Sequence, residues 1–201
     1  MWQAWSRFFY KSFGTDHCQY KMREIENPSG ELPADTHILL SGMESDINEA
    51  LLHGFLKHQQ DGDVKRTHLF NGRYENIYLT PGHIPQIRDL LDEACSLASS
   101  ILGIDDLQAG SWFNYMPPGA VTTLHSHDDD DELLSAVYYV SVPDHSGNLI
   151  IHDNDRQHVI APQQGLYVFF APDTMHEVSE NMSQQDRLSI GINFGRRDIG
   201  R

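Results

Sequence analysis

Residues 111–140 read SWFNYMPPGAVTTLHSHDDDDELLSAVYYV, and this stretch carries both the strand pattern and the chemistry that decide the fold. Aromatic and β-branched runs stand at its two ends, with a Pro-Pro-Gly turn and an acidic run between them. Runs of this kind, bounded by turn residues, predict short β-strands. His125 and His127 are two residues apart, so an extended backbone directs both imidazoles to one face, with about 7 Å between their Cα atoms.

The rest of the chain after residue 106 continues the strand pattern. The expected strands cover residues 111–116, 133–142, 148–153, 157–162, 165–171, 176–180 and 187–194. Seven short strands in succession predict an antiparallel sandwich or barrel.

The part before residue 106 is predicted to be helical. Apolar residues recur at helical spacing over residues 43–60 and 84–102, and this periodicity is typical of helices that cover a sheet. We therefore expect an α+β, mainly β chain. Its fold would be a double-stranded β-helix (a jelly-roll, cupin-like barrel) with two supporting helices from the N-terminal half. We expect one domain over residues 1–201, with a helical support region at 1–106 and the β-helix core at 107–196.

Composition excludes several classes of function. The 29 acidic and 14 basic residues give a net charge of −15, which argues against a nucleic-acid partner. No stretch approaches the roughly 18 consecutive apolar residues that a membrane helix needs. The N-terminus lacks the pattern of a secretory signal. The two cysteines, Cys18 and Cys95, are far apart in the sequence. Together these features predict a cytoplasmic protein.

A third histidine completes a candidate metal site. His176 follows 51 residues after His125, at the start of another predicted strand. Two close ligands and one distant ligand can hold a metal that keeps open positions, and imidazole ligands suit Fe(II). A His-x-His pair can equally belong to a polar loop, with His176 in a turn. Arg187 and Ser189 point the same way on the last strand, and an inward arginine needs an anion, such as a carboxylate.

Residues 111–194 resemble the Fe(II)- and 2-oxoglutarate-dependent oxygenases with a double-stranded β-helix. The similarity is greatest to a small bacterial and phage branch of that superfamily, whose motifs are W-x-N, HxH, S-G-x-Y-Y-V, P-x-x-x-H-x-V and R-x-S-I-x-x-N. The corresponding segments here are 112–114, 125–127, 135–140, 172–178 and 187–193, in the same order.

The resemblance implies an enzyme that uses Fe(II), 2-oxoglutarate and O2 and releases succinate and CO2. It implies hydroxylation of an unidentified small molecule or of an amino-acid or peptide substrate. By the same resemblance the metal ligands are His125, His127 and His176.

The resemblance also assigns residues to the co-substrate. Arg187 and Ser189 would hold the distal carboxylate of 2-oxoglutarate. Tyr115 and Tyr139 match tyrosines that contact the co-substrate in the prolyl-hydroxylase branch.

The chain departs from the superfamily at the second ligand, where most members have an aspartate. Three ligand sets are therefore open. His125, His127 and His176 agree best with the spacing from Tyr115. A shift by two residues would replace the first two with His127 and Asp129, and in the third set Glu132 contributes.

The set with Glu132 is that of the cupins, which bind metal without 2-oxoglutarate. Residues 119–132 fit the first cupin motif, G-x5-HxH-x4-E. Against a cupin, Tyr139 stands where the motif ends in glycine, and a cupin gives no reason for Arg187 and Ser189.

Two further segments have open interpretations. The acidic run at residues 128–132 would attract a cationic amino acid or basic peptide, or it is a solvated loop. An apolar cluster near the N-terminus would close the barrel, form the surface of a homodimer or be partly disordered, and the sequence does not decide between these. Its residues are Trp2, Trp5, Phe8, Phe9, Tyr10 and Phe13.

Overall fold

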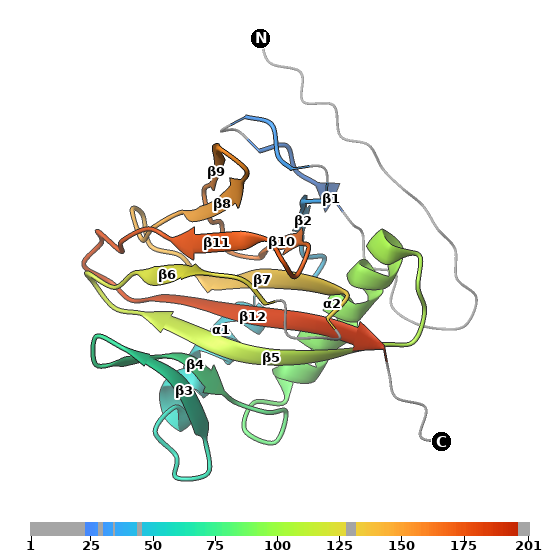
Figure 1. Ribbon diagram of the computed structural model, residues 1–201. Coiled ribbons are helices and arrows are strands. Elements are labelled where there is room, and N and C mark those ends of the chain that lie inside the picture. Colours follow the sequence, from blue (N-terminus) through green and yellow to red (C-terminus); the bar gives the residue numbers. More distant parts are fainter. Residues whose placement is uncertain (1–22, 28–29, 34, 44–45, 128–131, 197–201) are drawn as a thin grey trace.

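The computed structural model describes residues 23–27, 30–33, 35–43, 46–127 and 132–196 (Figure 1). The N-terminal aromatic cluster and the four aspartates of the acidic run therefore lie outside the described residues. Two antiparallel sheets form the body of the described part, and two helices cover one face of the larger sheet. This is the expected jelly-roll architecture, although the strands form two separate sheets and do not close into a barrel.

The larger sheet has eight strands in the order β1-β2-β10-β7-β12-β5-β4-β3. In that order the strands are Arg23–Glu24, His37–Leu40, Leu166–Phe170, Leu134–Ser141, Arg187–Arg196, Leu107–Met116, Arg73–Tyr78 and Lys65–Phe70.

The smaller sheet has four strands in the order β6-β11-β8-β9. These are Thr122–His125, Met175–Val178, Leu149–Asp153 and Arg156–Ile160.

The helices lie within the two ranges predicted from periodicity. α1 spans Asp46–His58 and α2 spans Gln86–Leu102. Their apolar stripes pack on the larger sheet and form one core with it. Gly103 ends α2 in the left-handed conformation, at φ 66°, and its N–H donates to the carbonyl of Ser99, so the helix closes where the sequence predicts. No helix in the described part of the chain is long and apolar enough to cross a membrane.

A buried carboxylate attaches α2 to the sheet. Glu93 is fully buried and accepts hydrogen bonds from the Ser41 hydroxyl at 2.7 Å, the Gly42 N–H at 2.8 Å and the Tyr167 hydroxyl at 3.1 Å. Three donors satisfy a charge that would otherwise be costly to bury.

Alternation along β12 separates the core from the site. Leu188, Ile190, Ile192 and Phe194 pack into the core with the helices. The alternate residues Arg187, Ser189 and Gly191 line a pocket on the opposite face, toward the smaller sheet. One strand therefore supplies the core with every second residue and the pocket with the others.

All seven expected strands are present, and five others, β1 to β4 and β6, were not predicted from the sequence. Residues 1–106 were expected to be a helical region, whereas β1 to β4 also come from there. The β3–β4 hairpin is rich in charged residues because it forms one edge of the sheet. Its turn, Asn71-Gly72, has φ of 48° and 78°, and Asn-Gly is a hairpin signal that the analysis overlooked. The short β6 consists mostly of polar residues.

Candidate active site

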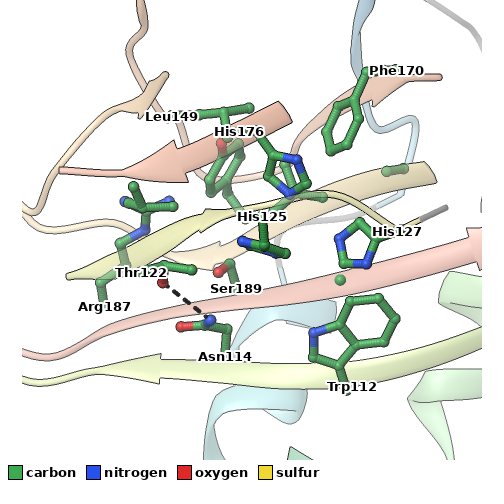
Figure 2. A pocket seen from close by; sticks show the side chains of 15 residues that line it. Trp112, Asn114, Thr122, His125, His127, Leu149, Phe170, His176, Arg187 and Ser189 are labelled. Carbon is green, nitrogen blue, oxygen red and sulfur yellow. Dashed lines mark hydrogen bonds between the residues drawn. The ribbon is translucent and has the colours of Figure 1, made fainter. Parts of the chain in front are cut away.

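A pocket opens between the two sheets and has an empty volume of about 480 Å3, part of it open solvent (Figure 2). Its lining includes His125, His127, His176, Arg187, Ser189, Tyr139, Asn114, Thr122, Trp112, Leu149 and Phe170. In the view of Figure 2 Arg187 lies to the left of the histidines, and Trp112 lies below His127.

Strand pairing brings the three histidines together. His125 ends β6 and is the cross-strand partner of His176 on β11. His127 lies just beyond β6, where its backbone N–H donates to the carbonyl of Pro172 at 2.8 Å. The ring centroids are 4.3 to 5.0 Å apart, and one nitrogen from each ring lies within 4.8 Å of the other two. Within the described residues, this is the group of side chains that could hold a metal ion.

Backbone carbonyls determine which ring nitrogen is available in two of these histidines. His125 Nδ1 lies 2.7 Å from the carbonyl of Thr123, and His176 Nδ1 lies 2.8 Å from that of Thr174. A carbonyl oxygen only accepts, so each Nδ1 carries the proton and each Nε2 keeps a free lone pair. A histidine that ligates a metal ion typically donates its other ring N–H to a backbone carbonyl or carboxylate in this way.

The surroundings of His176 favour its uncharged form. Burial, together with the neighbouring His125 and His127, lowers the pKa of His176 to about 3. His176 is therefore neutral at physiological pH and able to donate its lone pair to a metal ion.

Arg187 is the second notable feature of the pocket. The side chain is 1% exposed, and its Nη1 donates to the carbonyls of Gly147 at 2.8 Å and Ser146 at 3.3 Å. Its Nε has no hydrogen-bond partner among the described residues. Burial lowers its pKa, but a guanidinium stays protonated in proteins. A buried cation with a free donor is strongly favoured to meet an anion.

Gly147 supports this arginine, and sequence analysis did not identify it. Its φ is 94°, and a Cβ at this position would lie 2.2 Å from the carbonyl oxygen of Ser179. The loop that offers its carbonyls to Arg187 can therefore form only with glycine here.

A row of three polar side chains crosses the pocket floor. Ser189 on β12 pairs with Asn114 of β5 on one side and Tyr139 of β7 on the other. The Tyr139 hydroxyl is buried and has no hydrogen-bond partner in the described part of the chain. Its ring lies 5.2 Å from the Arg187 guanidinium. Burial raises the pKa of Tyr139, and the nearby Arg187 opposes this.

Tyr115 is not in the pocket, contrary to expectation. Its ring lies 5.4 Å from that of Phe55 on α1, on the helix-covered face of the sheet. Because side chains alternate along β5, Asn114 faces the pocket and Tyr115 faces away. Burial raises the pKa of Tyr115 to about 12, with Asp186 contributing.

Asn114 is held in place from two sides. Its Oδ1 accepts from Arg73 Nη1 at 3.3 Å, and its Nδ2 donates to Thr122 Oγ1 at 3.3 Å. Arg73 is itself paired with Glu75 at 2.9 Å. Neither Arg73 nor Thr122 was singled out from the sequence, because no motif marks them.

Trp112 lines the pocket, although aromatic residues at such positions are more often core. Its ring lies 5.2 Å from that of His127. A Cβ on the neighbouring Gly191 would lie 2.5 Å from the indole, so this glycine makes room for the ring. The signal was present in the sequence: Trp112 and Asn114 are two apart on one strand and share a face.

The sequence left Asp129 and Glu132 as alternative candidates for the second metal ligand. Asp129 lies outside the described residues. Glu132 is not in the histidine group and instead accepts from Asn193 Nδ2 at 3.4 Å. The four-ligand arrangement of a cupin is therefore not formed in the described structure.

The donor set fits the cofactors that the resemblance implies. Imidazole nitrogens with open coordination positions suit Fe(II). The unpartnered Arg187 Nε and Tyr139 hydroxyl are donors that a carboxylate would satisfy.

Comparisons with known proteins agree with this geometry. Residues 110–193 match the model of a family described as "Putative 2OG-Fe(II) oxygenase". No curated protein matches this sequence.

Solved structures share the fold at low sequence identity. A prolyl-4-hydroxylase from Pseudomonas putida is 24% identical, with a TM-score of 0.65 over 81% of this chain and 93% of that chain. A viral collagen prolyl hydroxylase from Paramecium Bursaria Chlorella virus-1 is 15% identical, with a TM-score of 0.61 over 82% and 97%. The carbocyclase SnoK from nogalamycin biosynthesis is 14% identical, with a TM-score of 0.66 over 81% and 79%.

The family match covers the strands that carry the histidines and Arg187, and the solved structures share the architecture around them. Residues 110–193 of this chain therefore match a family model of 2-oxoglutarate- and Fe(II)-dependent oxygenases, and the chain has the fold of enzymes of this type.

Proposed function

We propose that this enzyme is a non-haem Fe(II) dioxygenase that hydroxylates a small molecule or an amino-acid or peptide substrate, with release of succinate and CO2. One observation carries the proposal. A pocket holds three clustered imidazoles and, apart from them, a buried arginine with a free donor. The two groups match a metal ion and the distal carboxylate of a keto acid that chelates it.

His125, His127 and His176 are the proposed metal ligands. The carbonyls of Thr123 and Thr174 orient the Nε2 atoms of the two strand histidines toward a common point. Three neutral imidazoles leave the full charge of a divalent ion uncompensated by the protein. A dianionic co-substrate is then favoured as the next ligand.

Arg187, Ser189 and Tyr139 are proposed to bind the distal carboxylate of 2-oxoglutarate. Arg187 is preorganised because the carbonyls of Ser146 and Gly147 hold Nη1 and leave Nε free. A rigid cation loses little entropy when it binds, so more of the interaction energy appears as affinity.

The remaining lining residues separate the site from water. Leu149, Phe170 and Val178 form an apolar wall from the strands around the histidines. Iron with 2-oxoglutarate and O2 supplies the oxidising chemistry, while the chain orients the reactants and excludes solvent.

The similar structures indicate two broad classes of substrate for this fold. Two of the similar structures are named prolyl hydroxylases and one is named a carbocyclase from nogalamycin biosynthesis. Peptide and small-molecule substrates are therefore both in keeping with the fold. We further propose that residues 1–201 act as one domain, because α1 and α2 share a core with the larger sheet. We also propose a cytoplasmic location, because the two cysteines of the sequence are far apart and form no paired motif.

The test is an anaerobic titration of the Fe(II)-loaded protein with 2-oxoglutarate. Chelation of iron by the keto acid produces a visible charge-transfer band, which we expect in the wild type. His127→Ala is expected to lose iron. Iron binding with no band at saturating 2-oxoglutarate would reject the proposal in favour of metal chemistry without a keto acid.

A further inference from the structure

The inner face of the larger sheet extends beyond the pocket, on the side away from Arg187. Along β12 the inward residues run from Arg187 through Ser189 and Gly191 to Asn193, at about 7 Å per step. The smaller sheet covers this face near Arg187, which is 1% exposed. At the other end Gly110, the β5 partner of Asn193, is exposed to solvent.

This uncovered part of the larger sheet has free space above Gly110 and polar side chains beside it. A Cβ at Gly110 would meet no described atom within 4 Å. Asn193 pairs with Gly110 on one side and with Ser135 on the other. We call the row Gly110, Asn193 and Ser135, together with Glu132, the substrate shelf. It adjoins the histidine cluster through Trp112, one step back along β5.

Hydrogen bonds orient a carboxylate on this shelf. The Ser135 hydroxyl donates to Asn193 Oδ1 at 2.9 Å, which fixes the amide so that Nδ2 donates to Glu132 Oε1 at 3.4 Å. The second oxygen, Oε2, is buried and has no hydrogen-bond partner among the described residues. One long hydrogen bond leaves most of the acceptor capacity of a carboxylate unused.

An unsatisfied buried carboxylate oxygen is costly, so a donor supplied by a ligand is favoured there. The strongest donor for it is a positively charged nitrogen. The protein's net charge of −15 attracts such a group at long range, and the neighbouring indole of Trp112 can contribute a cation–π contact. A divalent metal is a poorer occupant, because Ca2+ takes six to eight oxygen ligands and the shelf has few.

We propose that Glu132, positioned by Asn193 and Ser135, binds a cationic nitrogen of the prime substrate, such as a lysine or arginine side chain, beside Trp112. The inference rests on the proposed function, which it extends to the class of substrate. Binding at the shelf would place an adjacent carbon of the same substrate next to the histidine cluster.

The test compares matched peptides. N-acetylated, C-amidated peptides that contain lysine or arginine are titrated calorimetrically, under anaerobic conditions, into the protein loaded with Fe(II) and 2-oxoglutarate. Norleucine and citrulline peptides are the neutral counterparts. We expect the cationic peptides to bind at least tenfold more tightly, and we expect Glu132→Gln to remove that preference.

Two further variants make the result specific. Glu49→Gln removes the same charge from an exposed position of α1, and we expect this variant to keep the preference. Gly110→Val adds a side chain at an exposed strand position where φ is not positive, so we expect it to fold. By filling the shelf it should weaken binding of the cationic peptides at least tenfold.

Several results would overturn the inference: no preference in the wild type, a preference retained by Glu132→Gln, an equal loss in Glu49→Gln, or wild-type binding by Gly110→Val. The visible 2-oxoglutarate band of the same wild-type sample shows whether the substrate class alone is wrong or whether the proposed function is wrong as well. If the band forms and no preference is seen, only the substrate class is wrong. If iron binds and no band forms, the proposed function fails, and the inference fails with it.

Discussion

The two ends of the inner face of β12 differ in how they are enclosed. At one end Arg187 is buried, its Nη1 is held by two carbonyls, and Tyr139 and Ser189 lie beside it. At the other end Asn193 is half-buried beside an exposed glycine. A closed end suits a partner that is always the same molecule, and an open end suits one that varies in size. We therefore assign 2-oxoglutarate to the closed end and the prime substrate to the open end.

The largest expected effect lies between the two ends, at the histidines. His176→Ala removes one of the three proposed ligands, and we expect iron binding to weaken by more than a hundredfold, because two imidazoles would remain of three. Metal content after anaerobic loading and desalting measures this. His152→Ala is the control, because His152 lies on β8 and pairs with Glu177 outside the cluster. Equal iron retention in both variants would contradict the assignment.

The next effect tests the closed end. Arg187→Met keeps much of the side-chain volume and removes the charge, and we expect the affinity for 2-oxoglutarate to fall at least a hundredfold, since hydrogen bonds to charged groups contribute about 1.5–3 kcal/mol each. We expect the free energy of unfolding to change little, because removal of an incompletely paired buried cation offsets the loss of the donor to the carbonyls of Ser146 and Gly147. Arg88→Met, on the exposed side of α2, is the matched control. An unchanged affinity would place the co-substrate elsewhere.

Gly147→Ala tests whether backbone geometry holds Arg187. A Cβ there would meet the Ser179 carbonyl oxygen at 2.2 Å, and φ is 94°. We expect a loss of about 2–4 kcal/mol in the free energy of unfolding, measured with denaturant, because the loop must shift to relieve both strains. The affinity for 2-oxoglutarate should fall with it. Gly62→Ala is the comparison, because nothing lies within 4 Å of its Cβ position and its φ is ordinary. Similar stability of the two variants would show that the loop adapts.

The smallest effect concerns a single hydroxyl. Tyr139→Phe removes a buried group that has no partner among the described residues. We expect the affinity for 2-oxoglutarate to fall about threefold to tenfold, in line with the loss of one neutral hydrogen bond of about 1 kcal/mol. The thermal midpoint should stay the same or rise, because the hydroxyl makes no compensating bond without ligand. A lower midpoint with unchanged affinity would assign Tyr139 to the core alone.

The fold could be predicted to the extent that its elements follow local periodicity. The helices over residues 46–58 and 86–102 lie within the predicted ranges, since a buried stripe at helical spacing is visible in any window of the chain. The edge hairpin β3–β4 was missed because one side of an edge strand faces water and carries charged residues. Hydrophobic patterning is weak where burial is weak.

The candidate site was predictable where short spacing along the chain places residues together, as for His125 with His127 and Arg187 with Ser189. It was not predictable where the face of a strand mattered. Tyr115 and Asn114 are adjacent on β5, and only the pairing with β12 and the packing on Phe55 decide which of them faces the pocket. A shift of one residue would exchange every side chain between the two faces.

By itself the sequence determined the mainly β character of the chain, the three histidines and the inward arginine, because residue type and short spacings state these directly. Only the tertiary structure decided the position of Glu132, which lies beside Asn193 and not with the histidines. Only the tertiary structure, too, gave Gly147 its role, because its carbonyl accepts from Arg187. Both depend on contacts between segments about 40 or more residues apart. Local sequence patterns do not encode such contacts, because they arise only when the sheets pack.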